Sequence, residues 1–164
     1  MIKKTHIIIY LLISLFYGCS TMYYNNIEAF THPLDSNPVS LYLKPAKYYK
    51  ELYPDTEAGW IVEITQKKGG YFKININDLS LNDVFIRTGE LGLTLRNVDS
   101  RKIPVYEHPD TLSSIKDYLS GAGIGKLYDI SNGFALLKFT IDGKITKGWI
   151  EFYHLCNNPY TTCN

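Results

Sequence analysis

Two dipeptides in the last third of the chain, Asn132-Gly133 and Asp142-Gly143, constrain the fold more than any other feature. Both suit the tight hairpin turn in which the two central residues need a positive φ. The stretches on either side, "KLYDIS", "FALLKFTI" and "KITKGWIEFYHL", are rich in residues that favour strands. The sequence therefore predicts three consecutive antiparallel strands, a β-meander.

The first half contains a weaker copy of this pattern in "GWIVEIT", "YFKINI" and "VFIRTGELGL". The matching positions, most of them at an offset of 64 residues, include Tyr42 with Tyr106, Phe85 with Trp149, and Gly70-Tyr71 with Gly133-Phe134. Self-similarity at a fixed spacing favours an internal duplication, with chance similarity as the alternative. Each unit is then predicted to have an edge strand ("SLYL" or "IPVY"), a long loop and a meander.

Composition and charge narrow the class of protein. The 164 residues suit one ordinary domain or two small ones, and the 14 Tyr, 7 Phe and 2 Trp sit among β-favouring residues. Lysine and arginine total 17 against 16 acidic residues, with no run of like charge. We expect an all-β protein that does not bind nucleic acid.

The N-terminus has the pattern of an export signal. Lys3 and Lys4 precede an apolar run over 7–17, which as a helix would rise only about 16 Å, too short to span a bilayer. Residues 1–18 are therefore predicted to be a cleaved signal peptide, with an uncleaved anchor as the alternative. Residues 19–37 have no clear period and are predicted to be a tether.

The Gly18-Cys19 junction resembles a bacterial lipoprotein signal, although Phe16 and Tyr17 depart from its usual residues. The resemblance implies that Cys19 carries the lipid and becomes the mature N-terminus. Ser20 after the cysteine implies an outer-membrane destination. Two or more acyl chains give stable membrane attachment, so we expect a lipid-anchored protein of the bacterial cell envelope.

The other two cysteines, Cys156 and Cys163, flank a short polar loop at the C-terminus. In an exported chain disulfides persist, so these two are predicted to pair. A zinc site with His154 is the alternative, and the disulfide competes with it directly for the thiolates. We expect no bound metal and no cofactor.

The segments "IPVYEHPD", "YDISNGFALLKF", "KGWIEF" and "CNNPYTTC" resemble the bacterial SH3 domain of Bacteroidetes-type lipoproteins. Phe134 stands where that family commonly has Trp. The resemblance, extended to the first half by internal analogy, implies two tandem SH3-like β-barrels, a divergent one over 38–97 and a second over 98–164.

Two short motifs invite a catalytic interpretation. "SSIK" matches the Ser-x-x-Lys of acyl enzymes at Ser113 and Lys116, but its companion motifs are absent. "GAGIG" over 121–125 looks like a phosphate loop, but it precedes a strand and not a helix. We therefore expect a protein that is not an enzyme.

Binding through aromatic side chains is the remaining hypothesis, because flat rings stack on peptide prolines and on sugar faces. The candidate ligand-binding residues are Tyr48, Tyr49, Tyr106, Tyr118, Trp149 and Tyr153, with Tyr42 and Trp60 as further first-half aromatics. Tyr48, Tyr49 and Tyr118 are expected in long loops, and core packing is the alternative for Trp149. The expected partner is a cell-wall peptide or glycan; alternatively, the chain is an envelope inhibitor or immunity lipoprotein that binds a protein.

Overall fold

The computed structural model describes residues 22–31, 38–53, 59–96, 102–120 and 123–157, the side chains of 22–26 excepted. The first six strands are β1 (Met22–Thr31), β2 (Val39–Lys44), β3 (Lys47–Leu52), β4 (Ile61–Lys68), β5 (Tyr71–Ile76) and β6 (Leu81–Arg87). The others are β7 (Leu91–Leu95), β8 (Ile103–Tyr106), β9 (Ile115–Leu119), β10 (Ile124–Ser131), β11 (Phe134–Ile141), β12 (Lys144–Glu151) and β13 (Leu155–Cys156). Two short 3-10 turns, η2 (Asn77–Leu79) and η3 (Phe152–His154), complete the described elements.

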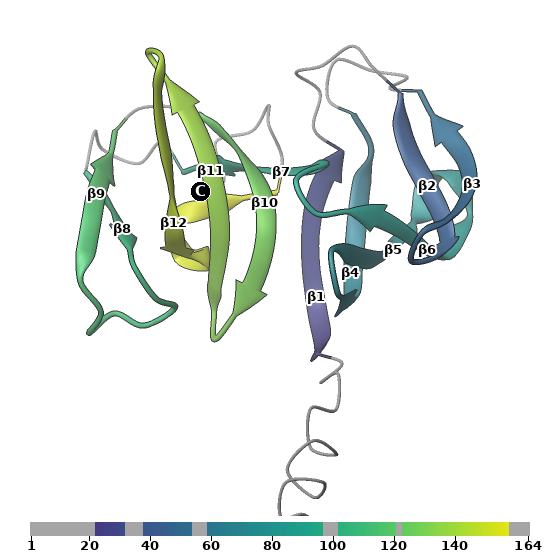
Figure 1. The fold of residues 1–164 in the computed structure, drawn as a ribbon, viewed down its shortest axis with the longest axis horizontal. Helices are drawn as coiled ribbons and strands as arrows, with labels where there is room; N and C mark the ends of the chain where they lie inside the picture. Colours follow the sequence, from purple (N-terminus) through teal and green to yellow (C-terminus); the bar gives the residue numbers. More distant parts are fainter. Residues whose placement is uncertain (1–21, 32–37, 54–58, 97–101, 121–122, 158–164) are drawn as a thin grey trace, which may run out of the picture.

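All these strands join one antiparallel sheet in the order β3-β2-β6-β5-β4-β1-β7-β10-β11-β12-β8-β9, with β13 paired to β7 off this path. Figure 1 shows β2 to β6 on one side of the β1–β7 junction and β8 to β12 on the other. The all-β expectation is confirmed. The path does not close, so two closed barrels are not shown; β1 pairs with β7 instead and joins the two halves.

The strand order is the same when read outward from the β1–β7 junction in either direction. The first half runs β1-β4-β5-β6-β2-β3 and the second half runs β7-β10-β11-β12-β8-β9. Each strand of the second half therefore takes the place of the strand numbered six lower in the first half. Two cross-strand pairs repeat as well: Tyr42 lies opposite Phe85, and Tyr106 lies opposite Trp149. These are the positions that the offset of 64 residues aligns in the sequence.

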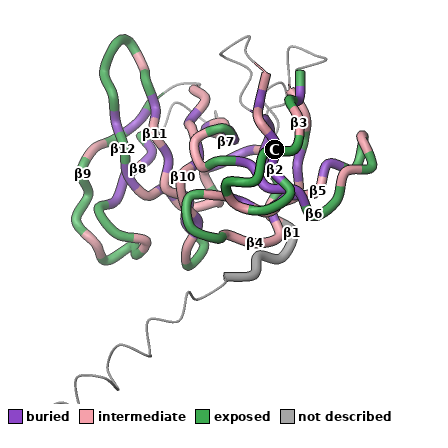
Figure 2. The backbone as a smooth tube through the Cα atoms, turned by 45° about the vertical axis from the view of Figure 1, so that its right-hand side comes forward, coloured by how far each residue is buried: buried purple, intermediate pink, exposed green. Residues whose placement is uncertain are grey.

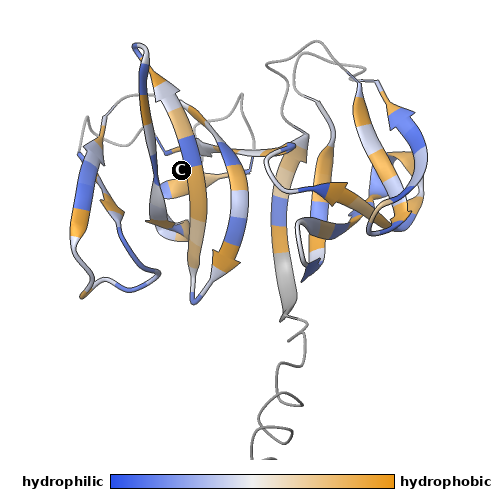
Figure 3. Cartoon of the chain, in the orientation of Figure 1, coloured by the Kyte–Doolittle hydropathy of each residue, from blue (hydrophilic) through white to orange (hydrophobic). Residues whose placement is uncertain are grey.

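The two hairpin turns form as the sequence predicts. The φ angles are 51° and 79° at Asn132 and Gly133, and 49° and 75° at Asp142 and Gly143. Along β11, the strand between the two turns, successive side chains point to opposite faces of the sheet. One of these faces carries Ala135, Leu137 and Phe139, which are all buried. Figures 2 and 3 show this alternation of buried with exposed and of apolar with polar residues along the strands.

Three strands lie where the sequence predicts none. β1 occupies 22–31 of the predicted tether, and pairs with β4 through Ile27–Ile64 and Ala29–Val62. Since Ala29 and Val62 are buried, this stretch belongs to the folded sheet. β3 and β9 lie in the predicted long loops, so the predicted edge strands β2 and β8 are second from the edge.

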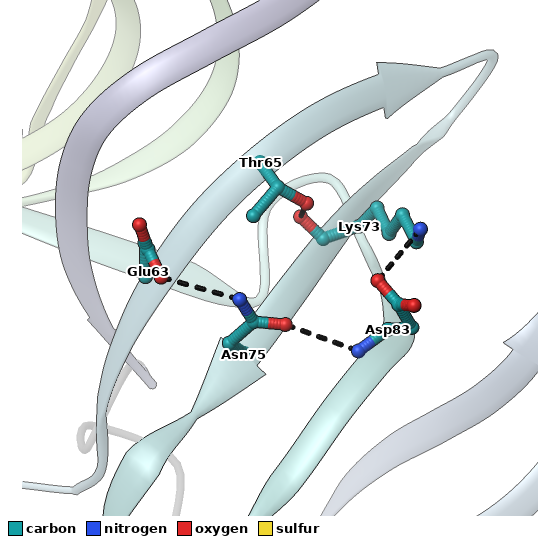
Figure 4. Close-up of polar contacts among 5 residues, drawn as sticks. All are labelled: Glu63, Thr65, Lys73, Asn75 and Asp83. Atoms are coloured by element: carbon teal, nitrogen blue, oxygen red, sulfur yellow. Dashed lines mark hydrogen bonds and ion pairs between the residues drawn. The ribbon is translucent and has the colours of Figure 1, made fainter.

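Polar side chains fasten β4, β5 and β6 to one another (Figure 4). The Asn75 amide donates to Glu63 at 3.2 Å, and its oxygen accepts from the backbone N–H of Asp83 at 3.1 Å. Lys73 pairs with the Asp83 carboxylate at 2.7 Å. Asp83 has a φ of 59°, a conformation that aspartate tolerates better than most residues. These polar side chains therefore bond to one another across the strands, and we assign them a role in holding the sheet together.

Among the described residues, no helix has the length and apolar character needed to cross a bilayer. The predicted signal peptide over 1–18 and the predicted lipidation site Cys19 lie outside the described residues.

Candidate functional site

An aromatic cluster of Tyr106, Phe134 and Trp149 lies on β8, β11 and β12. Tyr106 and Trp149 are direct cross-strand partners, so their side chains project from the same face of the sheet. The Phe134 ring meets the Tyr106 ring edge to face, with centroids 5.7 Å apart and planes at 88°. Tyr106 and Phe134 are buried, whereas Trp149 is half-buried and keeps part of its indole accessible.

Tyr118 extends this cluster toward the sheet edge. It lies on β9 opposite Pro104, and Pro104 is two residues before Tyr106 on β8. Side chains two residues apart on a strand share a face, so Tyr118, Pro104, Tyr106 and Trp149 form one strip. Tyr118 is 52% exposed. The strip therefore offers an exposed phenol ring and a half-buried indole with a buried tyrosine between them.

The aromatic strip has charged neighbours, and burial and charge together raise the pKa of Tyr106. Burial raises the pKa of the Tyr106 phenol, and the nearby Glu151 carboxylate and Tyr118 raise it further. Lys147 and Glu151 each lie two residues from Trp149 on β12, so their side chains are on the same face of the sheet as Trp149. The Lys147 ammonium lies 4.2 Å from the centre of the Tyr128 ring, a cation–π distance. The aromatic surface thus has a cationic and an anionic neighbour.

Asp117 fixes β9, and with it Tyr118, against β12. Its carboxylate pairs with Lys144 at 2.6 Å, accepts the Thr146 hydroxyl at 2.9 Å and accepts the backbone N–H of Tyr118 at 2.9 Å. These hydrogen bonds, that from Lys144 first, lower the pKa of Asp117 to about 2. A cavity of about 210 Å³ lies beside this group and is lined by Tyr118, Phe139 and Ile141 among others.

The first half has an equivalent aromatic group centred on Tyr42. Tyr71 meets Tyr42 edge to face at 5.2 Å, and Tyr48 meets it at 6.3 Å. The Arg87 guanidinium lies 5.4 Å from the Tyr42 ring centre, and a hydrogen bond with Tyr71 raises the pKa of Arg87. Tyr71 and Arg87 are absent from the predicted site, although the Gly70-Tyr71 match in the sequence pointed to the first of them. In the first half the Arg87 guanidinium therefore lies over the central Tyr42 ring, where a ligand would otherwise stack.

The structure does not bring all six predicted residues together. Tyr48 and Tyr49 lie on β3, at the opposite end of the sheet from Tyr118 on β9. Tyr153 lies in η3, 74% exposed, against His154 and Arg96. The expected loop positions of Tyr48, Tyr49 and Tyr118 are wrong, because all three are on edge strands that the turn signals did not reveal.

Trp60 serves the fold. It is half-buried and packs against the core, and its indole N–H donates to the Tyr53 carbonyl at 3.1 Å. Its backbone exchanges two hydrogen bonds with Thr31 at the end of β1.

The two catalytic motifs have structural explanations. The Ser113 hydroxyl accepts the backbone N–H of His108, and the Lys116 ammonium donates to the Lys147 carbonyl. At Gly125 an added Cβ would lie 2.5 Å from the Phe139 ring, so this glycine of "GAGIG" makes room for a core side chain. Residues 121–122 of the motif lie outside the described residues.

No group of three or more histidine, cysteine or acidic side chains that could hold a metal occurs within the described part of the chain. Cys156 is disulfide-bonded. Its predicted partner Cys163 lies outside the described residues, so the pairing itself stays a prediction. His154 lies 3.7 Å from the Glu151 carboxylate.

No family model matches this chain, and no curated protein matches it either. Two similar solved structures are NlpC2 and NlpC1 from Trichomonas vaginalis, each 18% identical to this chain with a TM-score of 0.32. The matches cover 82% of this chain and 49% of NlpC2, and 84% of this chain and 48% of NlpC1. This chain spans about half the length of both proteins. Likeness at this level does not say what this chain binds or catalyses.

Proposed function

We propose that this chain is a non-enzymatic, lipid-anchored protein of the bacterial cell envelope that binds cell-wall peptide or glycan. The observation that carries the proposal is the strip of Tyr118, Pro104, Tyr106 and Trp149 on one face of the sheet. Its accessible rings can stack on a proline or on the apolar face of a sugar. Lys147 and Glu151 beside Trp149 can orient the polar groups of such a ligand.

The second half is the better binding unit. Trp149 is half-buried and Tyr118 is 52% exposed, whereas Phe85, the residue equivalent to Trp149, is only 8% exposed. Arg87 also lies over Tyr42 in the first half. The first half therefore has no accessible ring at the position equivalent to Trp149, and we assign it a supporting role.

The finer architecture in this proposal is two SH3-like units in tandem, over 38–97 and 98–164, with β1 added to the first. The repeated strand order supports it, because β1 to β6 and β7 to β12 follow the same sequence of pairings. The ends of the two halves also correspond: β7, which follows the first six strands, pairs with the first strand β1, and β13, which follows the next six, pairs with β7. The closing strand of the first unit would then be the opening strand of the second.

Attachment to the membrane is the second part of the proposal. Cys19 carries the lipid after removal of 1–18, and the outer membrane is the destination. Since β1 begins at Met22, the sheet then follows the lipid almost directly. Such an attachment would keep the folded sheet close to the membrane surface.

Co-sedimentation of the full chain with purified peptidoglycan tests the binding claim. Tyr118→Ala should weaken binding by roughly twofold to twelvefold, since one aromatic contact contributes about 0.5 to 1.5 kcal/mol. Tyr53→Ala is the matched control, because Tyr53 is 65% exposed and lies away from the strip on the first half. Failure of the wild-type chain to sediment would refute wall binding. A stoichiometric envelope protein recovered in a pull-down would then support the inhibitor or immunity alternative.

A further inference from the structure

The sheet forks at β7. One edge of β7 pairs with β1 through Leu91 and Gly92, and farther along with β13 through Thr94 and Leu95. β1 and β13 therefore pair with the same edge of β7, one after the other along its length, and the two strands diverge near the middle of β7. This fork belongs to the junction of the two halves and contains none of the residues of the aromatic strip.

A cavity of about 300 Å³ lies in the fork. This volume is at the small end of the range for ligand sites, about 300 to 1,000 Å³. Ile27 of β1, Leu93 of β7, Phe152 of η3 and Leu155 of β13 give the cavity an apolar lining. The cavity therefore suits the hydrocarbon part of a small molecule.

Arg96 supplies the cation of this cavity. Its Nε is buried and has no hydrogen-bond partner among the described residues. The guanidinium carbon lies 5.9 Å from the centre of the Tyr153 ring, and the Arg96 backbone N–H donates to the His154 carbonyl at 2.8 Å. The arginine is thus held by its backbone and by one ring, while a buried charged donor still needs an acceptor.

The mouth of the cavity carries the opposite charge. Glu28 of β1 is exposed and accepts a hydrogen bond from the Asn157 amide, which ties β1 to the end of β13 across the fork. A carboxylate at the mouth repels anions in proportion to their charge. This repulsion offsets part of the attraction of Arg96, so an anion with an apolar body that packs in the cavity has an advantage over a purely inorganic anion such as phosphate.

We infer that the fork cavity binds a small monocarboxylic acid with a short apolar body. The carboxylate accepts from the Arg96 guanidinium, a charge-assisted pair that favours this geometry. The hydrocarbon part packs against Ile27, Leu93, Phe152 and Leu155. The inference is independent of the proposed wall binding, because the two sites share no residue.

Titration of the isotope-labelled full chain with 4-methylpentanoate, followed by amide chemical shifts in NMR spectra, tests this inference. We expect saturable shifts at Leu93, Arg96 and Leu155, and none at Tyr48 on the far edge of the sheet. The alcohol 4-methylpentan-1-ol and inorganic phosphate should bind at least about tenfold more weakly, equal to about 1.4 kcal/mol. Equal binding of the alcohol, or no saturable shift with the acid, would overturn the inference.

Two variants separate the roles of charge and space. Arg96→Met should weaken binding of the acid at least about tenfold, a loss of about 1.4 kcal/mol, while Lys68→Met, which removes an exposed charge elsewhere on β4, should leave it unchanged. Ile27→Phe keeps Arg96 and narrows the cavity, so it should also weaken binding of the acid, and it serves if Arg96→Met does not fold. Undiminished binding by either cavity variant contradicts the assignment.

Discussion

Replacement of Gly125 by alanine tests the packing of the second half most directly. The new Cβ would lie 2.5, 2.8 and 2.9 Å from three atoms of the Phe139 ring. Carbon atoms in contact are normally about 3.5 to 4.0 Å apart, so the ring must retreat by roughly 1 Å. Phe139 is only 1% exposed, so its ring can move only against its core neighbours or into the cavity of about 210 Å³ that it lines.

The expected loss of stability follows from two opposing effects. Overpacking a core of this kind costs about 1 to 3 kcal/mol. The lower entropy of the unfolded chain with alanine offsets about 0.4 to 1 kcal/mol of this. We expect Gly125→Ala to lower the free energy of unfolding by up to about 2.6 kcal/mol and Tm by up to roughly 10 °C, and to be less stable than a glycine-to-alanine change that causes no overpacking.

Urea denaturation of the full chain measures this effect as a lower midpoint at an unchanged slope. Gly70→Ala is the matched control, because nothing lies within 4 Å of its Cβ position. The double variant Gly125→Ala with Phe139→Leu should be more stable than the sum of the single effects by about 1 kcal/mol or more. Strict additivity, or a Gly125→Ala variant as stable as the control, would show that the ring does not require this glycine.

The remaining predictions concern charge and anchoring. Asp117 has a folded-state pKa of about 2, below its ordinary value of 3.8, so its stabilising effect is complete above pH 3.8 and is lost as the pH falls toward 2. Asp117→Asn should therefore flatten the fall of Tm between pH 4 and pH 2, and an unchanged acid profile would contradict the role of the Lys144 pair. Cys19→Ser should release the protein from the membrane fraction of expressing cells, and full retention in that fraction would refute lipid attachment.

The last third of the chain was the most predictable part of the fold. Positive φ values at Asn132-Gly133 and Asp142-Gly143 depend only on local sterics, which the dipeptides themselves carry. The three strands they join therefore follow from the sequence. The pairing of Tyr106 with Trp149 does not follow from the sequence, since it depends on the register of β8 against β12.

The first strand and the two edge strands were not predictable in the same way. The β2–β3 hairpin turns at Pro45-Ala46, with φ of 62° at Ala46, where no Asn-Gly or Asp-Gly signal exists. β1 has no strict alternation in its sequence and is held by pairing with both β4 and β7. Such strands are stabilised by distant partners and not by their own propensity.

The candidate binding residues divide along the same line. The aromatic content and the matched positions of the two halves identified Tyr106 and Trp149 as candidates, and an expected loop position identified Tyr118, because residue type is visible in the sequence. Which rings share a face depends on strand register, as for Tyr118 and Pro104, and the order of the strands separates Tyr118 from Tyr48 by the width of the sheet.

The sequence by itself determined the all-β class, the two hairpin turns and the repeated positions of the aromatic residues, because each depends on local conformation or composition. Only the tertiary structure decided that the strands form one open sheet, that β7 carries both β1 and β13 on one edge, and that Arg96 reaches the cavity between them. Those features arise from pairing between residues far apart in the chain, for which no local pattern exists.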